Sequence, residues 1–441
     1  SRKIISENIV ADRSKLKIIC VFLYRIYFGR IPYEGQYRGK KRKAMNITEL
    51  QQSYASHPNV EGVCRLLKDN SVRHLYCGGL YASAASLFSS VLVQRATCPL
   101  VFILGDMEEA GYFYHDLTQI LGTEQVLFFP SSFRRAIKYG QKDAANEILR
   151  TEVLSRLQKG EEGLCVVTYP DALAEKVVSR KELGDNTLKL HAGERVDMNF
   201  VTDVLRSYGF EYVDYVYEPG QYAVRGSIID VFSFSSEYPF RIDFFGDEVE
   251  SVRTFEVETQ LSKEKKESIV IVPDLSHSLE KKGSGGMVSF LDFLPSDSLL
   301  AMRDFLWLRE RIQTVHDESL TPQAIAARES EENGAITLEG KLIDGGEFTL
   351  RALDFRRMEF GNKPTGTPDA TISFHTTVQP IFHKNFDMVA ESFREYLSRH
   401  YTIYICSDSL KQTDRIRAIF EDRGDNISFT AVERTLHEGF A

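Results

Sequence analysis

The sequence predicts an α/β protein that has a parallel sheet, an inserted antiparallel α+β domain and part of a further α/β domain. After Met45, apolar runs of about five residues alternate with helical stretches of 10–15 residues, which is typical of βαβ units. Between 175 and 258 the pattern changes to short alternating strands separated by turn signals. A βαβ pattern returns over 402–431. The 441 residues are 43% hydrophobic and 27% charged, as expected for a globular protein of several domains.

The first lobe is predicted from helical caps and buried runs. Asn46 and Asn59 can each cap a short helix, and the run of apolar residues at 100–104 ends in Gly105-Asp106, as a buried strand would. We expect helices over 46–53, 59–67, 82–94, 108–120 and 144–158, and strands over 100–104, 126–129 and 164–168.

The inserted part is predicted to combine one helix with an antiparallel sheet. Asp197 can cap a helix that ends at Gly209, and the apolar residues of this helix fall on one face: Phe200, Val201, Val204, Leu205 and Tyr208. Strands are expected over 212–217, 222–224, 228–232, 240–245 and 248–255. We therefore expect a small α+β domain.

Charge is distributed unevenly along the chain. Residues 1–44 hold 12 Lys/Arg against 3 Asp/Glu, whereas the remainder carries a net charge of −18. The acidic remainder argues against a non-specific nucleic-acid binder. We expect residues 1–44 to be an extension outside the fold, with Met45 a plausible natural start; the alternative is a basic arm that contacts nucleic acid or membrane.

Cysteine and histidine spacing indicates neither a disulfide framework nor a metal site. The six cysteines form no CxxC pair, and the ten histidines show no zinc-binding spacing. No apolar run reaches the ~18 residues that a membrane span needs. We expect a reduced, cytoplasmic protein without a metal and without contact with a membrane.

These patterns divide the chain into six stretches. We expect a basic extension (1–44), a first part of the main domain (45–174), an inserted domain (175–258), a second part of the main domain (259–318), a linker (319–334) and a partial third domain (335–441).

A glycine-rich turn stands where a nucleotide phosphate would bind, at the start of the helix within 78–90. An intact P-loop requires a Gly-Lys pair followed by Ser or Thr. The chain has only Gly39-Lys40 and Gly340-Lys341, and neither is followed by a hydroxyl residue. The sequence therefore contains no intact Walker A motif.

Two neighbouring stretches carry a family resemblance, YEPGQYAVRGSIIDVF at 217–232 and YPFRIDFFGDEVESVR at 238–253. They resemble the second domain shared by UvrB and the transcription-repair-coupling factors (Mfd). The resemblance extends over most of 45–441 and is thin after about 320. It implies that the parallel-sheet domain is a degenerate RecA/helicase-like (UvrB-like) domain, and that the inserted domain binds UvrA.

The family's nucleotide motifs are altered in this chain. At the P-loop position, Ala85 replaces the lysine and Ala82 and Ala84 replace two glycines, with Ser86 following. In the second motif, Arg303 occupies the position of the Asp on the magnesium side, next to Asp304. A cation there is unsuited to holding Mg²⁺. The resemblance thus implies a degenerate site with no nucleotide cofactor and no enzyme activity in this part of the protein.

The resemblance also directs attention to one face of the inserted domain. Arg225 precedes Gly226 at a turn, where a guanidinium can pair with a partner carboxylate. Tyr222 and Phe232 would flank it as aromatic anchors, and Arg206 would be a rim contact. The alternative is that Arg225 pairs internally, with Asp230 or Asp243, and that Phe232 fills the core of the small domain.

A further stretch, 128–140, matches the position of the DNA-clamping hairpin of UvrB. It is short and contains one tyrosine, and its three cations, Arg134, Arg135 and Lys138, form a weak patch that we interpret as a solvated loop face.

The function implied by the resemblance is that of a non-catalytic UvrB-like module of a transcription-repair-coupling factor. Such a module recruits UvrA to start nucleotide excision repair at stalled RNA polymerase. The parent protein would be an ATP-dependent DNA translocase that binds RNA polymerase and double-stranded DNA through domains absent here. The alternatives are an active UvrB-like ATPase that verifies DNA damage, and a DNA-binding module that needs no nucleotide.

Overall fold

The structure is a computed structural model, and it describes residues 18–22, 44–132, 144–274, 286–320, 340–382 and 385–441. The predicted loop cations Arg134, Arg135 and Lys138 and most of the predicted linker lie outside the described residues. Among the described helices, none is long and apolar enough to cross a membrane.

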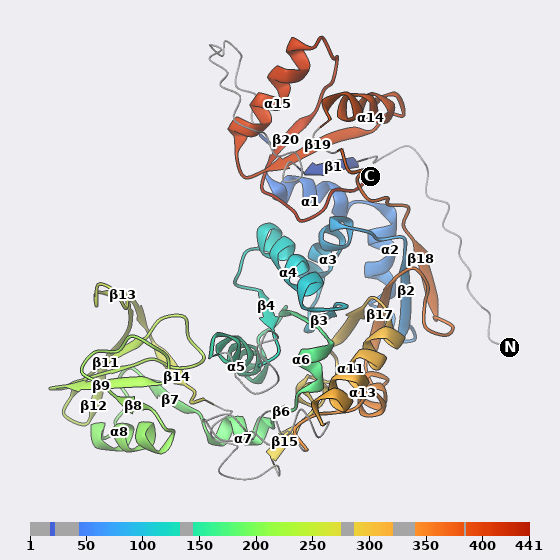
Figure 1. The fold of residues 1–441 in the computed structure, drawn as a ribbon. Helices are drawn as coiled ribbons and strands as arrows, with labels where there is room; N and C mark the ends of the chain where they lie inside the picture. Colours follow the sequence, from blue (N-terminus) through green and yellow to red (C-terminus); the bar gives the residue numbers. More distant parts are fainter. Residues whose placement is uncertain (1–17, 23–43, 133–143, 275–285, 321–339, 383–384) are drawn as a thin grey trace.

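A seven-stranded, fully parallel sheet forms the centre of the molecule (Figure 1). Its strands, in spatial order, are β18 (Ala370–Ser373), β2 (His74–Gly78), β17 (Arg356–Gly361), β16 (Leu299–Met302), β3 (Leu100–Ile103), β5 (Cys165–Thr168) and β4 (Val126–Phe129). β2, β3, β5 and β16 are buried at every position, as expected of parallel strands covered on both faces. The predicted parallel α/β sheet is confirmed.

Helices pack around this sheet in two groups (Figure 1). One group contains α1 (Ile47–Ala55), α2 (Pro58–Leu66), α3 (Ser83–Arg95) and α4 (Met107–Leu121). The other contains α6 (Pro170–Ala174), α10 (Phe290–Phe293), α11 (Phe305–Ser319) and α13 (Gly345–Ala352). α5 (Ala144–Lys159) packs against β4.

The expected helices of the first lobe are present within one or two residues at each end. Asn46 caps α1 by accepting the Thr48 N–H at 3.0 Å, as predicted. α2 instead begins at Pro58, and its cap is the His57 ring, which accepts the Asn59 N–H at 3.2 Å. A proline at the first helical position loses no hydrogen bond, so the helix extends one residue beyond the expected start.

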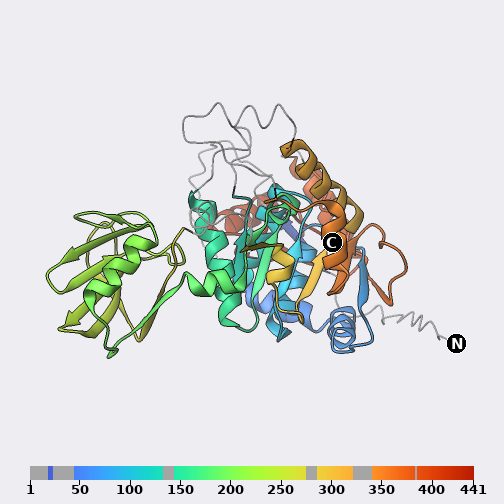
Figure 2. The same ribbon diagram turned by 90° about the horizontal axis from the view of Figure 1, so that it is seen from below.

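The inserted domain projects from the main body as a separate lobe (Figures 1 and 2). Its six-stranded sheet contains, in spatial order, β13 (Ser262–Lys266), β12 (Glu248–Phe255), β11 (Phe240–Phe245), β10 (Ile228–Val231), β9 (Gln221–Arg225) and β8 (Glu211–Tyr212). The helix α8 (Met198–Ser207) covers one face and is capped by Asp197, as predicted. β7 (Leu188–His191) pairs with β14 (Ser268–Ile271) where the chain enters and leaves the domain.

The inserted domain therefore runs from 188 to 271, which corrects the expected boundaries of 175–258. The stretch before it, with β6 (Val177–Val178) and α7 (Arg180–Asp185), packs on the main domain, and Leu183 belongs to the main core. β6 pairs with β15 (Met287–Val288), on the far side of the insertion. The strand β13 was not expected from the sequence, because its lysine-rich, mostly exposed residues show the same pattern as a loop.

The expected strand at 212–217 is wrong except at its start. β8 contains only Glu211 and Tyr212, and it runs parallel to β9. The chain then leaves the sheet because Val216 packs into a small cluster with Phe232 and Phe255.

The third domain is smaller than expected. Residues 345–373 supply α13, β17 and β18 to the main domain, so the stretch 335–441 is not one unit. What remains is a three-stranded parallel sheet of β1 (Ile18–Phe22), β19 (Thr402–Ser407) and β20 (Thr430–Glu433), with α14 (Phe386–Ser398) and α15 (Leu410–Asp422).

The strand β1 also corrects the expectation that all of 1–44 lies outside the fold. It pairs in parallel with β19, from Ile18 opposite Thr402 to Phe22 opposite Cys406. The backbone of this apolar run pairs with one edge of β19, and without it the N–H and C=O groups of that edge would have no strand partner.

Candidate functional site

Two parts of the structure were predicted to carry function: the turn after β2 and the sheet of the inserted domain. The turn lies at the carboxyl end of the parallel strands, the usual place for ligands in such sheets. At Gly79 (φ 74°) an added Cβ would lie 1.9 Å from the carbonyl oxygen of Phe374. Ala82, at the start of α3, has φ 51°, a conformation that costs little only for glycine. The turn therefore has a backbone conformation suited to glycine at both Gly79 and Ala82.

The backbone N–H groups of this turn are used within the protein. The Tyr81 N–H donates to Thr376 Oγ1 at 2.9 Å, and the Ser83 N–H donates to the carbonyl oxygen of Glu438 at 3.2 Å. The N–H groups of Ala84 and Ala85 donate to carbonyls of the turn itself, both at 3.2 Å. In a phosphate-binding turn such groups point at the ligand. Here four of them already have acceptors.

A carboxylate from α4 occupies the space beside the start of α3. Asp116 accepts hydrogen bonds from Ser83 Oγ (2.6 Å), Ser86 Oγ (2.9 Å) and the His437 N–H (2.6 Å). Burial raises the pKa of Asp116 to about 6, against the lowering effect of these three hydrogen bonds. The sequence analysis missed this residue. The sequence feature that could have identified it is a single Asp between Phe113 and Leu117, on the apolar and buried face of the helix.

At the second stretch that the resemblance singles out, Arg303 forms an ion pair. Arg303 pairs with Glu109 on α4, and Glu109 also accepts the Gly105 N–H at 2.8 Å. Asp304 is the N-cap of α11, where it accepts the Trp307 N–H at 3.0 Å. Both residues therefore have structural partners here.

A cavity of about 340 Å³ remains at this place. The predicted residues Ala82, Ala85, Ser86 and Arg303 line it, whereas Ala84 and Asp304 do not. Its other lining residues include five carboxylates: Asp106, Glu108, Glu109, Asp116 and Glu438. One of these carboxylates, Glu109, is paired with Arg303, which also lines the cavity.

In the inserted domain, strand alternation places Tyr222 and Arg225 on opposite faces of the sheet. The Arg225 guanidinium pairs with Asp230, which is fully buried. Arg241 binds the same carboxylate through Nε (2.7 Å) and Nη2 (2.9 Å). The alternative in which Arg225 pairs internally with Asp230 is thus the one observed. About a third of the Arg225 side chain remains exposed, and its guanidinium lies 5.0 Å from the centre of the Tyr215 ring.

The two predicted aromatic anchors are buried, so neither presents a free ring on the surface. Tyr222 is 1% exposed beneath α8, and its hydroxyl accepts a hydrogen bond from Arg206 Nε at 3.1 Å. Phe232 is 7% exposed within the small cluster around Val216. Arg206 itself is exposed and also pairs with Asp203 at 3.2 Å. The structure therefore does not bring Arg206 and Arg225 together on one face.

Other aromatic residues of this domain are exposed where the predicted ones are not. Tyr212, Tyr215 and Tyr217 are each more than half exposed, and they lie next to β9, the strand that carries Arg225. Tyr212 packs edge-on against Tyr222, with ring centres 5.5 Å apart. Exposed tyrosines beside an arginine are typical of protein interfaces. They were missed because 212–217 was expected to be a strand with alternate burial.

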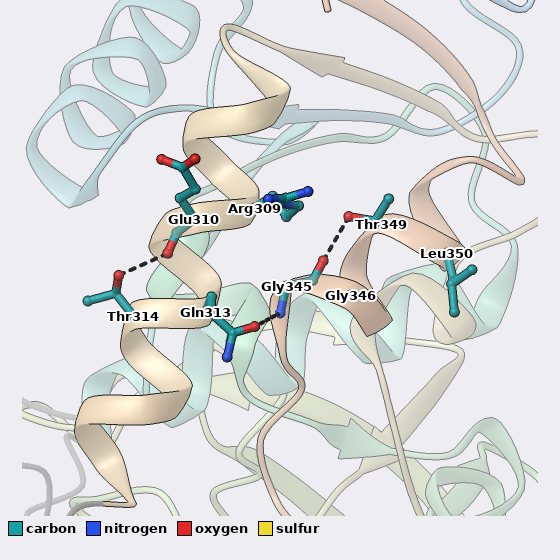
Figure 3. Close-up of a pocket in the computed structure, with 8 residues that line it drawn as sticks. All are labelled: Arg309, Glu310, Gln313, Thr314, Gly345, Gly346, Thr349 and Leu350. Carbon is teal, nitrogen blue, oxygen red and sulfur yellow. Dashed lines mark hydrogen bonds between the residues drawn. The ribbon is translucent and has the colours of Figure 1, made fainter.

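A second hollow lies in the main domain between α11 and α13 (Figure 3). It measures about 600 Å³, and hydrogen bonds within its walls satisfy several of its polar groups, including Gln313 Oε1 from the Gly345 N–H at 3.1 Å. Within the described part of the chain, no group of three or more His, Cys, Asp or Glu side chains is arranged to hold a metal ion. We assign no ligand to this hollow.

Comparisons with known proteins identify the inserted domain. Residues 188–277 match the family described as the UvrB interaction domain, and this range agrees with the structural boundaries of 188–271. The lobe is therefore similar to the UvrB interaction domain over nearly its whole length.

The wider chain is similar to curated proteins named transcription-repair-coupling factor. It is 29% identical to that of Escherichia coli strain K12 over 44% of this chain and 17% of that protein. It is 30% identical to that of Bacillus subtilis strain 168, over 44% and 16%. It is 22% identical to that of Staphylococcus aureus strain RF122, over 82% and 35%. The resemblance stated from the motifs is confirmed, and the matches span about a third or less of the length of these relatives.

Proposed function

We propose that this chain is a non-catalytic module of a transcription-repair-coupling factor, and that it recruits UvrA through its UvrB interaction domain to start nucleotide excision repair. The match of 188–277 is the observation that carries this proposal. The names of the relatives support a role in coupling repair to transcription. The domain projects away from the main body, so a partner can approach it from the side (Figure 2).

Arg225 is the residue we place at the centre of the UvrA contact. Asp230 holds its guanidinium from one side and the Tyr215 ring lies near it, so the side chain is ordered before a partner arrives. Ordering in advance lowers the entropy cost of binding. Asp230 is shared by Arg225 and Arg241, so this buried cluster keeps one net positive charge. A carboxylate on the partner would complete it.

The tyrosines supply the apolar part of the proposed contact. Tyr215 and Tyr217 present rings that can lose solvent on binding and hydroxyls that can form hydrogen bonds. Tyr222 and Phe232, expected as contacts, support the sheet from within in this proposal. Arg206 remains a rim contact on the other side of β9, held by Tyr222.

We base the proposed absence of catalysis on three observations, two at the turn after β2 and one at the end of β16. The position of the P-loop lysine is Ala85, four N–H groups of the turn have internal acceptors, and Arg303 pairs with Glu109. We propose that this part of the protein binds no nucleotide cofactor. As the resemblance stated from the motifs implies, ATP-driven translocation on double-stranded DNA and binding of RNA polymerase would belong to other parts of a cytoplasmic parent protein.

A pull-down with UvrA tests this function. Arg225→Ala should retain less than a tenth of the UvrA that the wild type retains, since removing a central arginine typically costs at least ~2 kcal/mol of binding energy. Arg253→Ala is the matched control, because Arg253 is also 35% exposed and pairs with an aspartate, Asp243, of the same sheet. Equal retention of UvrA by wild type and Arg225→Ala would contradict the proposed role of Arg225. Micromolar binding of ATP with Mg²⁺ in a calorimetric titration would instead favour the rival ATPase.

A further inference from the structure

The segment 434–441 contributes two residues, His437 and Glu438, to the lining of the cavity at the start of α3. This segment follows β20 of the third domain and returns to the main domain. Its apolar residues Leu436 and Phe440 are each 2% exposed and belong to the core of the main domain. Between these two buried side chains lie His437 and Glu438, at the start of α3.

The contacts of His437 and Glu438 reproduce, in part, those that a bound anion would make. The carbonyl oxygen of Glu438 accepts the Ser83 N–H at the first position of α3, a position where helices commonly bind phosphate oxygens. The Glu438 N–H donates in return to Ser83 Oγ at 3.0 Å. The His437 N–H donates to Asp116 at 2.6 Å. Ser83 Oγ donates to the same carboxylate, so one hydroxyl connects both parts of the contact.

A ring contact completes the arrangement. The imidazole of His437 stacks on Tyr112 of α4 with ring centres 3.4 Å apart and planes 9° apart. The Tyr112 ring is still 40% exposed, and the cavity of about 340 Å³ lies beside the stack. Water can therefore reach the polar part of the segment, although Leu436 and Phe440 are buried.

We propose that the former nucleotide site is a peptide-docking site whose ligand is the segment 434–441 of the same chain. The segment binds and opens as one unit together with the start of α3 and with the stretch 377–379, whose backbone hydrogen-bonds to Gly439 and Ala441. Opening exposes the Ser83 N–H, and closing ties the third domain to α3 and α4, because the segment continues directly from β20. This inference goes beyond recruitment of UvrA, and its test needs neither UvrA nor nucleotide.

Hydrogen–deuterium exchange of the full chain, followed by mass spectrometry, tests the proposal. Ser83→Ala removes the hydroxyl that bonds to both Asp116 and Glu438. We expect peptides covering 80–86 and 434–441 to exchange about tenfold faster than in the wild type, and both together. His437→Ala, which removes the ring stack but keeps the backbone N–H that donates to Asp116, should raise both rates by a smaller factor.

Ser90→Ala is the matched control, since Ser90 lies two turns further along α3 and bonds to Gln51 Nε2 at 3.0 Å. It should leave both peptides at the wild-type rate. The proposal is overturned if exchange over 434–441 is unchanged in both test variants, or if it rises without a matching rise over 80–86.

Discussion

Replacing Asp116 with asparagine should stabilise the main domain at neutral and alkaline pH, although the substitution removes a carboxylate that accepts three hydrogen bonds. The pKa of Asp116 is about 6 in the folded chain and 3.8 as the reference for an unfolded carboxyl group. Since the folded value is the higher one, this group favours folding below pH 3.8, and that contribution is lost as the pH rises through about 6. Each pKa unit corresponds to ~1.4 kcal/mol, so the loss amounts to about 3 kcal/mol.

Asparagine fits the hydrogen-bonding pattern without the charge. Its carbonyl oxygen can accept the His437 N–H, and its amide can donate to the hydroxyls of Ser83 and Ser86, which accept as well as donate. We expect Asp116→Asn to be more stable than the wild type by about 1–3 kcal/mol at pH 8 and equal to it below pH 4, where the aspartic acid is already neutral.

Urea unfolding followed by fluorescence measures this difference. The chain has a single tryptophan, Trp307, and it lies on α11 of the main domain, so its emission reports this domain. Asp414→Asn, at an exposed aspartate of the third domain, is the control and should show no difference that varies between pH 4 and pH 8. The reasoning is refuted if Asp116→Asn is less stable than the wild type at pH 8, or if the difference does not grow between pH 4 and pH 8.

Three further outcomes follow from the same structure. Arg241→Ala should lower the free energy of unfolding of the inserted domain by about 2–4 kcal/mol, because Arg241 makes two of the bonds to the buried Asp230. Arg225→Ala should lower it by about 1 kcal/mol. Circular dichroism during urea unfolding compares the two variants, and an equal loss of stability would contradict this ranking. Ala85→Lys should show no heat of binding in a calorimetric titration with ATP and Mg²⁺, because introducing a lysine does not free the N–H groups of the turn. Measurable binding would show that these N–H groups are available to the nucleotide. Gly79→Ala should cost about 3 kcal/mol or more, since its Cβ would meet the Phe374 carbonyl at 1.9 Å, and an unchanged melting temperature would contradict this packing.

The sequence was most informative where apolar periodicity and caps agree. The strand 100–104, the helix capped by Asp197 and the strands 240–245 and 248–255 appear in the structure within a residue of their expected limits. In each case a turn or cap residue marks the end of an apolar pattern. Local patterns of this kind determine the type of an element but do not reveal its distant partners.

Long-range pairing explains the errors in the expected domains. β17 and β18 are separated from β2 by nearly 300 residues and pair with it in the main sheet, which no local pattern indicates. The run at Ile18–Phe22 was apolar enough for a strand, but its partner β19 lies almost 400 residues away. The limits of 188–271 for the inserted domain depend on the pairing of β7 with β14, which is also long-range.

At the candidate site, the sequence predicted the types of the residues better than it predicted which of their side chains are exposed. The sequence shows that Ala85 stands at the position where the family resemblance expects a lysine, whereas the contact of Glu438 with the turn depends on where the third domain sits. Arg225 was correctly placed next to a turn. The burial of Tyr222 and Phe232 was missed because it depends on α8 and on the chain around Val216 crossing over the two faces of the sheet.

Affinity for UvrA, measured by calorimetry on five chains, tests the central claim most directly. The chains are the wild type, Arg225→Ala, Tyr215→Ala, the double variant and the control Arg253→Ala. If Arg225 and Tyr215 form one contact with UvrA, each single change should weaken binding at least tenfold and the double change by less than the product of the two factors, because the residues contact each other. Wild-type affinity in the double variant would contradict the assignment of this face to UvrA. An equal loss in Arg253→Ala, whose side chain lies on the same face of the sheet, would contradict a contact centred on Arg225 and Tyr215.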